Sequence, residues 1–290
     1  MILITGASGS AGGAVLEAAV AAGSPLRAMY RSNEDARKTP KNVGAVVADF
    51  ADKSSLRNAL RGIESVYLVC GPVPQLVELE GNMIDACKEA NVRHIVLNSA
   101  LGAGDFQKSF PSWHFEAERK LKDSGLAYTI LRPNGFMQNI VTYNAGSIRA
   151  QGAFYAAMGD AKISMIDVRD IGAAAAGILL DPAAHAGKTY QLNGPEAVSN
   201  FDIAERISRV AGRKVSYVDI PEEAQRKGML DVGMPEWLVT AVLQLQEYYR
   251  SGRCATVDGA VAKLTGRPER TLDQYLVENA ASFQSQAAAT

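Results

Sequence analysis

At 290 residues, with 47% hydrophobic and 21% charged side chains, the chain has the composition of a globular protein with a sizeable core. Its net charge of −1 at pH 7 provides no field that would attract nucleic acid or an anionic membrane surface. No apolar run approaches the ~18 residues of a membrane-spanning helix. We therefore expect neither nucleic acid nor a membrane as a partner.

Cysteine and histidine usage favours a cytoplasmic protein without a metal site. The three cysteines are sparse and form no CxxC motif, which is typical of a reducing compartment: Cys70, Cys87 and Cys254. Met1 leads directly into a strand-like ILITG, without the basic segment of a signal peptide. The three histidines are too far apart to pair as HxxxH, so we expect no metal ligands among them: His94, His114 and His185.

The first half of the chain alternates short apolar runs with amphipathic stretches. The runs, in chain order, are ILITG, LRAMYR, GAVVADF, SVYLVC, HIVLNSA and YTILRP. Short runs of this kind separated by helices indicate parallel strands that are buried on both faces. Right-handed crossovers then predict an α/β fold with a doubly wound parallel sheet, a Rossmann domain.

The pattern changes after Pro133 and predicts a smaller, mostly helical lobe. SMIDV and TYQLNG still read as strands, whereas most of the later sequence reads as helices around a short strand, KVSYVDI. We expect residues 1–135 to form the dinucleotide-binding domain, with 160–195 returning to it because SMIDV resembles a further sheet strand. Residues 136–159 and 196–290 form the expected substrate-binding lobe.

A glycine-rich stretch, ITGASGSAGG, joins the first predicted strand to the first helix. Gly6 permits a tight turn, Gly9 lets the backbone approach phosphate, and Gly12 lets the helix pack against the sheet. Backbone N–H groups at the helix start then face an anion. An ordinary turn is the alternative reading. The expected pyrophosphate contacts are Gly6, Ser8, Gly9, Ser10, Ala11 and Gly12.

Arg31 follows the second strand, where an NAD-preferring fold usually carries an acidic residue that holds the ribose 2′-hydroxyl. A guanidinium favours the 2′-phosphate of NADP instead, and the Ser32 hydroxyl adds a further donor. The sequence therefore predicts NADPH in preference to NADH, with a solvated surface arginine as the alternative.

Two further turns at the same sheet edge are candidate contacts for the cofactor. Asp49 and Phe50 end the third strand and are placed to flank the adenine, although Asp49 is equally suited to a turn or a helix cap. The fourth strand ends in a Gly-containing turn that permits close backbone approach to a ribose: Cys70, Gly71 and Pro72.

Together with these stretches, HIVLNSA, AYTILRPNGFMQN and the later DVRDIGAAAA make the chain resemble the NmrA-like atypical short-chain dehydrogenases. The resemblance is greatest to their quinone-oxidoreductase and triphenylmethane-reductase-like members. It implies an NAD(P)-binding sheet domain and a small lobe, with a flat substrate between them. The family also includes regulators that bind the dinucleotide without catalysis.

The chain departs from conventional short-chain dehydrogenases in its catalytic residues. None of its ten tyrosines is followed by the lysine of the Tyr-x-x-x-Lys pair. His114 and Glu118 occupy the corresponding place and share a helix face. We expect Glu118 to hydrogen-bond His114 or the ribose, and His114 to assist proton transfer or to face solvent at the helix start. Ser99 takes the place of the catalytic serine, with a simple turn hydroxyl as the alternative.

The sixth strand ends at Pro133 and Asn134, where we expect either contact with the nicotinamide or a structural turn. Apolar side chains suited to a flat substrate are Trp113, Phe136, Met137, Tyr143 and Trp237, each of which is equally typical of a protein core. The sequence predicts an NAD(P)H-dependent reductase of a quinone-like, dye-like or similar electron-poor small molecule. The alternative is a dinucleotide-sensing regulator.

Overall fold

The computed structural model describes residues 1–285, which fall into two compact units. The first, here the sheet unit, comprises Met1–Pro133, Val168–Leu192 and Ala260–Arg267. The second, the lobe, comprises Asn134–Asp167, Asn193–Gly259 and Pro268–Thr290, the last five residues of which fall outside the description. Compared with the expected ranges, residues 134–135, 160–167 and 193–195 group with the lobe, whereas 260–267 group with the sheet unit.

The sheet unit is built on seven parallel strands in the order β3-β2-β1-β4-β5-β6-β9. The six predicted runs and TYQLNG all form strands of this sheet, which confirms the doubly wound fold. The strands are β1 (Ile2–Ile4), β2 (Leu26–Tyr30), β3 (Gly44–Val47), β4 (Ser65–Leu68), β5 (His94–Asn98), β6 (Ala127–Pro133) and β9 (Thr189–Leu192). The order reverses beside β1, so the loops after β1 and β4 flank the switch point where such sheets bind ligands.

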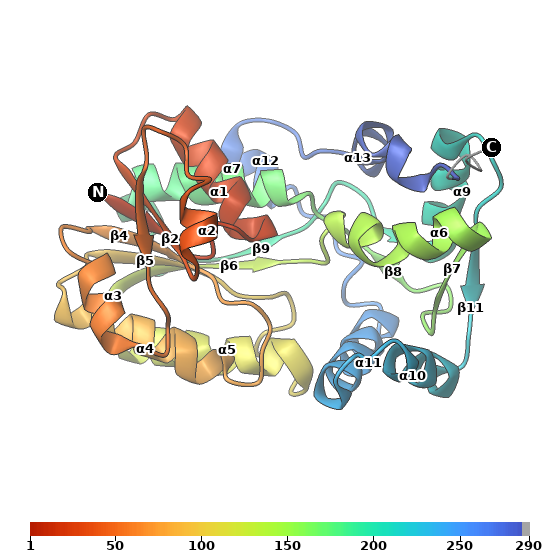
Figure 1. Cartoon of the computed structure of the whole chain (residues 1–290), viewed down its shortest axis with the longest axis horizontal. Helices are drawn as coiled ribbons and strands as arrows, with labels where there is room; N and C mark the ends of the chain where they lie inside the picture. The colour runs from red at the N-terminus through yellow and green to blue at the C-terminus, as the bar shows by residue number, and fades with distance from the viewer. Residues whose placement is uncertain (286–290) are drawn as a thin grey trace. The chain divides into compact units, whose positions relative to one another are not determined.

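Helices cover both faces of the sheet (Figure 1). One face carries α1 (Ser10–Ala21), α2 (Asn33–Ala36), α7 (Val168–Leu180) and α12 (Ala260–Thr265), and the other carries α3 (Lys53–Ala59), α4 (Leu76–Glu89) and α5 (Ser109–Asp123). A short α8 (Pro182–His185) precedes β9. Helices α1 and α7 approach closely, because a Cβ on Gly172 would lie 2.5 Å from the carbonyl oxygen of Ala14.

The main core of the sheet unit lies between the strands and helices α3, α4 and α5. Fully buried side chains from both layers meet there, among them Leu3, Leu56, Val66, Leu68, Met83, Ile84, Ile95, Leu97 and Leu121. Burial of each such side chain contributes roughly 1.5–3 kcal/mol, so this face holds the carboxyl ends of the strands in fixed positions.

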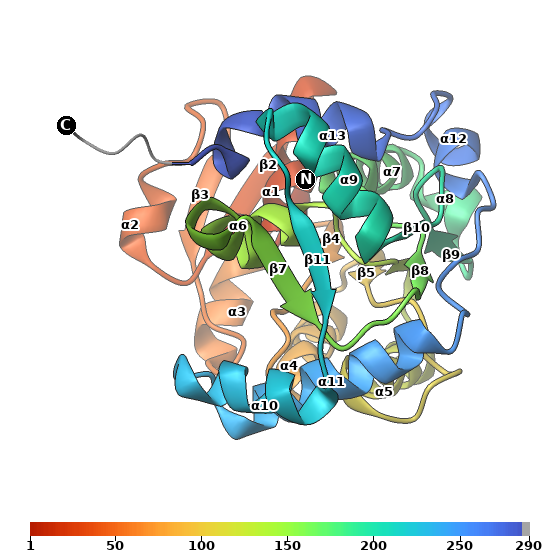
Figure 2. The same cartoon turned by 90° about the vertical axis from the view of Figure 1, so that its right-hand side faces the viewer.

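The lobe is mostly helical, with two small two-stranded sheets (Figure 2). Its strands are β7 (Ala153–Ala156), β8 (Lys162–Ile163), β10 (Val198–Ser199) and β11 (Ser216–Asp219), the last being the predicted strand KVSYVDI. Its helices are η1 (Ile140–Asn144), α6 (Ala145–Gln151), α9 (Asn200–Ala211), α10 (Glu222–Asp231), α11 (Glu236–Arg250), α13 (Leu272–Glu278) and η2 (Ala280–Phe283). Phe154, Ile207, Leu276 and Phe283 lie at the centre of its core.

SMIDV does not join the large sheet, so that expectation was wrong. Strand β8 ends at Ile163 and pairs antiparallel with β10, while Ile166 makes an isolated bridge to Phe136. The segment is apolar because it is buried in the lobe, where Ser164, Met165 and Ile166 are all buried. An apolar run of five residues indicates burial but not the sheet in which it pairs.

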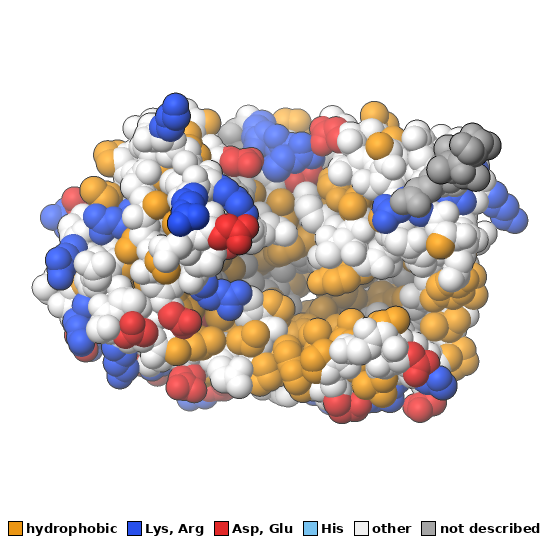
Figure 3. Space-filling view, in the orientation of Figure 1, with side chains coloured by type: hydrophobic (Ala, Val, Ile, Leu, Met, Phe, Trp, Pro, Cys, Tyr) orange, Lys and Arg blue, Asp and Glu red, His pale blue; other side chains and the backbone are white. Residues whose placement is uncertain are grey.

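Over the described range, 1–285, no helix is long and apolar enough to cross a membrane. On the face shown in Figure 3, Lys and Arg side chains are interspersed with Asp and Glu, as the near-zero net charge leads one to expect.

Candidate dinucleotide site

The loop between β1 and α1 can be formed only by glycine at two positions. Gly6 has φ +59°, a left-handed conformation that L side chains rarely adopt. A Cβ on Gly12 would lie 2.2 Å from the carbonyl oxygen of Gly6 and 2.6 Å from that of Thr5, so the first turn of α1 packs directly on the backbone of β1. The loop closes on itself through the Gly9 N–H, which donates to the Gly6 carbonyl oxygen at 2.8 Å.

The N-terminus of α1 has the features of an anion site. Gly9 is the N-cap and provides no side-chain hydrogen bond, and the first turn carries no acidic residue. Ser8, Gly9 and Ser10 are exposed. The first amides of the helix have no intrahelical acceptor, and the helix dipole adds partial positive charge there. A dinucleotide pyrophosphate therefore fits this loop.

A hollow of about 430 Å³ lies against the same loop, entirely within the sheet unit. Besides the glycine loop and one face of α1, it is lined by the first two residues of α7, Val168 and Arg169. Arg169 was not predicted from the sequence. The available signal was its place in DVRDI, two residues after a buried Asp167 at a helix start.

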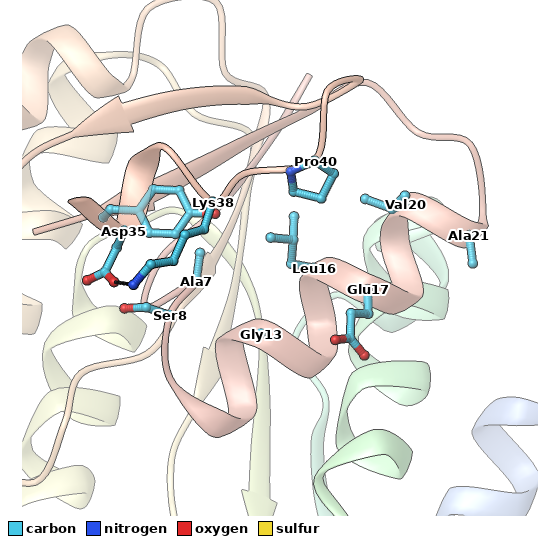
Figure 4. Close-up of a pocket in the computed structure, with 11 residues that line it drawn as sticks. Ala7, Ser8, Gly13, Leu16, Glu17, Val20, Ala21, Asp35, Lys38 and Pro40 are labelled. Atoms are coloured by element: carbon cyan, nitrogen blue, oxygen red, sulfur yellow. Dashed lines mark hydrogen bonds and ion pairs between the residues drawn. The ribbon is translucent and has the colours of Figure 1, made fainter. Parts of the chain in front are cut away.

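Arg31 is exposed directly after β2, as the sequence places it, but Ser32 is already engaged. Ser32 caps α2: its hydroxyl oxygen accepts the N–H of Asp35 at 3.1 Å and its hydroxyl donates to the Asp35 carboxylate at 3.0 Å. The Lys38 ammonium lies 3.2 Å from that carboxylate (Figure 4). The hydrogen bonds from Ser32 and Lys38 lower the pKa of Asp35, which keeps it anionic.

Lys38 and Asp35 also line a groove of about 560 Å³ between α1 and the segment after β2 (Figure 4). Ala7, Ser8 and Tyr30 line the same groove, which therefore extends from the glycine loop to the end of β2. Lys38 was not predicted from the sequence. It supplies a second cation beside Arg31 and offsets the charge of Asp35.

Asp49 and Phe50 have structural roles of their own. Asp49 is exposed, and its carboxylate accepts the N–H of Ala51 at 2.8 Å, the turn that was the alternative reading. The Phe50 ring packs partly against the main core, and its carbonyl oxygen accepts a hydrogen bond from the Asn82 amide at 3.1 Å. Their contact with adenine stays a prediction.

A buried carboxyl group, that of Glu80, hydrogen-bonds the turn formed by Cys70, Gly71 and Pro72. The Cys70 N–H donates to Glu80 Oε1 at 3.2 Å, and Glu80 Oε2 has no partner among the described residues. Burial raises the pKa of Glu80 well above its usual range, which favours the neutral carboxyl group. Glu80 was missed, although it lies at helical spacing between Leu76 and Met83 on the buried face of α4.

Glu118 is the centre of a buried ion cluster at the carboxyl ends of β5 and β6. The Ser99 hydroxyl donates to Glu118 Oε1 at 2.6 Å, and the Arg132 guanidinium binds both carboxylate oxygens at 2.8 and 2.6 Å. Lys122 adds a contact at 3.5 Å. Burial alone would raise the pKa of Glu118, but the hydrogen bonds from Arg132 and Ser99 outweigh it and lower the pKa. Arg132, hidden in the run YTILRP, was not predicted.

His114 is buried within α5, so the alternative that it faces solvent was wrong. Its Nδ1 has no hydrogen-bond partner in the described part of the chain. Burial lowers the pKa of the imidazole to about 4, against a smaller opposing effect of the Glu118 charge. At neutral pH His114 is therefore uncharged.

This pKa predicts a specific acid sensitivity. The folded pKa lies below the ordinary 6.5, so the folded protein binds fewer protons and loses stability as the pH falls from about 6.5 towards 4. Between pH 7.5 and pH 5 the loss attributable to His114 is about 2 kcal/mol. Urea unfolding at the two pH values should give a smaller drop for His114→Gln, by that amount. Equal drops in the two proteins would contradict the buried neutral state.

Along the chain, the first segment of the sheet unit ends at Pro133 and the lobe begins at Asn134. Pro133 ends β6, and its carbonyl oxygen accepts the Leu101 N–H at 2.9 Å. The Asn134 amide group donates to Asn193 Oδ1 at 3.0 Å and to the Cys254 carbonyl oxygen at 2.9 Å, while its oxygen accepts the Gly135 N–H. Both of its amide hydrogens are thus used inside the lobe, which favours the structural reading over a nicotinamide contact.

The aromatic and apolar candidates differ in accessibility. Trp113 lies in the sheet unit, half-buried and edge-on to Phe110. In the lobe, Met137 is 1% exposed and belongs to the core, whereas Tyr143 on η1 is 71% exposed and Trp237 38%. Phe136 is half-buried beside Ile166. Core burial therefore disfavours a substrate contact for Met137 and leaves the others as candidates.

Within residues 1–285, no group of three or more His, Cys, Asp or Glu side chains is arranged to hold a metal ion. In the same range, Cys70, Cys87 and Cys254 form no disulfide bond.

A model of the NmrA-like family matches residues 1–276. The chain belongs to the NmrA-like family. It is 35% identical over 285 residues to an NAD(P)H azoreductase of Xenophilus azovorans, covering 98% of this chain and 99% of the azoreductase.

Two solved structures of the family share its fold. One is the NADPH complex of a quinone oxidoreductase from Escherichia coli, 30% identical, with a TM-score of 0.88 over 96% of this chain and 99% of that one. The other is the NADP(H) complex of the triphenylmethane reductase from Citrobacter sp., 23% identical, with a TM-score of 0.84 over 97% of this chain and 100% of that one; at this identity the likeness concerns the fold alone.

Proposed function

We propose that this protein is an NADPH-dependent reductase of flat, electron-poor acceptors such as quinones and azo dyes. The observation that carries the cofactor is the glycine cradle at the start of α1, in which a Cβ on Gly12 would overlap the Gly6 carbonyl oxygen. The acceptor class comes from the relatives, which are named for the reduction of azo compounds and quinones and match this chain over nearly its full length.

The protein's contribution is to hold the cofactor and orient it. NADPH, when bound, supplies the hydride that reduces the acceptor. The amides of Ser10 and Ala11 bind the pyrophosphate at the start of α1, since the Gly9 amide is used in closing the loop onto Gly6. Arg31 binds the 2′-phosphate through its guanidinium, with Lys38 as a second cation nearby. Proposed contacts to the nicotinamide half come from the turn after β4 and from Ser99.

Proton supply is the step for which the chain lacks conventional residues. His114, uncharged at neutral pH, is a weak acid. The Ser99 hydroxyl donates to Glu118 and is therefore not free to donate outward while that carboxylate is ionised. A quinone or azo acceptor spreads negative charge over its ring system and depends less on a dedicated acid. The absence of Tyr-x-x-x-Lys supports acceptors of this class over simple carbonyl compounds.

The acceptor class is tested by following NADPH oxidation at 340 nm with quinones, azo dyes, triphenylmethane dyes and small aldehydes and ketones at matched concentrations. We expect turnover with the delocalised acceptors and little with the carbonyl compounds. Preference for simple carbonyls would contradict the assigned class. Tight NADPH binding without oxidation by any acceptor would favour a dinucleotide-sensing regulator.

A further inference from the structure

We propose that Arg169, at the start of α7, is a ligand of the cofactor pyrophosphate and contributes affinity that does not discriminate NADPH from NADH. This rests on the dinucleotide site proposed above. It assigns a role to a side chain that lies 138 positions beyond Arg31 in the sequence.

The placement of Arg169 is the first support. Arg169 and Val168 line the hollow of about 430 Å³ together with Ser8, Gly9 and Ser10, the residues that form the proposed phosphate cradle. All of them belong to the sheet unit. The position is fixed rather than incidental, because α7 packs backbone to backbone on α1 where a Cβ on Gly172 would meet the Ala14 carbonyl oxygen at 2.5 Å.

Charge is the second support. The hollow has one cationic and one anionic side chain in its lining, Arg169 and Glu17. Glu17 is exposed and lies two turns into α1, whereas Ser10 is at the start of that helix and Arg169 is in the first turn of α7. A dianionic pyrophosphate at the start of α1 would therefore lie in the same hollow as Arg169. Arg169 is half-buried, so solvent screens its charge less than that of an exposed arginine.

The guanidinium matches this task chemically. It presents parallel N–H groups that bind two phosphate oxygens at once, while backbone amides each bind one. Arg31 and Arg169 would then bind different phosphate groups of the cofactor. Arg31 binds the 2′-phosphate, which only NADPH carries, and Arg169 binds the pyrophosphate, which both cofactors carry.

This division gives a test with four ligands whose dissociation constants are measured by calorimetry or competition. ADP carries the pyrophosphate without a 2′-phosphate, and adenosine 2′-monophosphate carries the reverse. Loss of a charge-assisted contact corresponds to roughly 10-fold or more in affinity. Arg169→Ala should therefore weaken NADPH, NADH and ADP about equally, by roughly 10-fold, and leave adenosine 2′-monophosphate nearly unchanged. Arg31→Ala should weaken NADPH and adenosine 2′-monophosphate and spare the other two.

Arg57→Ala is the matched control, because Arg57 is an exposed arginine on α3, on the opposite face of the sheet, and its removal should leave all four constants unchanged. Arg169→Lys keeps the charge but not the paired N–H groups and should lose less affinity for NADPH, NADH and ADP. This variant provides the test if the alanine variant does not fold. Parent-like NADPH binding by both Arg169 variants would overturn the assignment, as would equal weakening of ADP and adenosine 2′-monophosphate. Failure of the parent itself to bind NADPH would instead overturn the proposed function.

Discussion

Gly12→Ala is expected to lower both folding stability and NADPH affinity more than any other single-methyl change in the sheet unit. The added Cβ would lie 2.2 Å from the Gly6 carbonyl oxygen, 2.6 Å from the Gly6 carbonyl carbon and 2.6 Å from the Thr5 carbonyl oxygen. These are backbone atoms, so α1 must move away from β1 and carry the anion-binding amides with it. We expect a loss of about 3 kcal/mol in unfolding free energy and at least roughly tenfold in NADPH affinity.

Gly13→Ala provides the matched comparison one residue along the same helix. A Cβ there would lie 3.4 Å from the Ala7 carbonyl oxygen, an ordinary contact, and α1 would gain a better helix former. Its stability should equal or exceed that of the parent, and because Gly13 lines the hollow, its NADPH affinity should fall by less than that of Gly12→Ala. Chemical unfolding and titration of intrinsic fluorescence with NADPH measure both quantities. A Gly12→Ala protein that matches Gly13→Ala in stability and affinity would refute the close-packed cradle.

Arg31→Ala is expected to remove most of the preference for NADPH over NADH. The two cofactors differ only by the 2′-phosphate, and hydrogen bonds to a charged group contribute about 1.5–3 kcal/mol, or roughly 10- to 150-fold in affinity. Since Ser32 is committed to capping α2, the guanidinium is the main donor at this position. The dissociation constant of NADPH should therefore rise in the variant, while that of NADH changes little.

Lys38 and the nearby acidic residues set the size of the effect. Lys38 lies 3.2 Å from Asp35 and 3.4 Å from Glu34, so it offsets charges that would repel the phosphate. Lys38→Ala should weaken NADPH binding less than Arg31→Ala does. Because both contacts are exposed, added salt should reduce the NADPH advantage of the parent. Equal affinity of the parent for NADPH and NADH would contradict the assignment of Arg31.

The sheet was predictable because its determinants are local. Parallel strands that are buried on both faces read as short apolar runs, and the helices between them read as amphipathic stretches. The prediction for SMIDV failed because burial alone does not specify a pairing partner. Its partner in the lobe is distant in sequence, since Ile166 bridges to Phe136, 30 positions earlier.

The parts of the site that depend on backbone geometry could be predicted from the sequence, whereas most contacts between distant side chains could not. The glycine positions follow from steric limits that any βα turn of this kind must obey. Ser32 carried a readable signal, since a serine followed three residues later by an acid is typical of a helix cap. The cluster of Glu118, Ser99 and Arg132 carried none, because its three members come from α5, from the end of β5 and from β6 and meet only in the folded protein.

The central claim, that the bound dinucleotide reduces a flat acceptor directly, is tested by anaerobic turnover of a simple quinone with NADPH labelled with deuterium at C4. We expect one hydroquinone to form per NADPH consumed and a slower reaction with the label in the transferred position, whereas Gly12→Ala should be impaired with either isotopologue. Acceptor reduction without NADPH consumption, or NADPH binding with no quinone reduction, would contradict it.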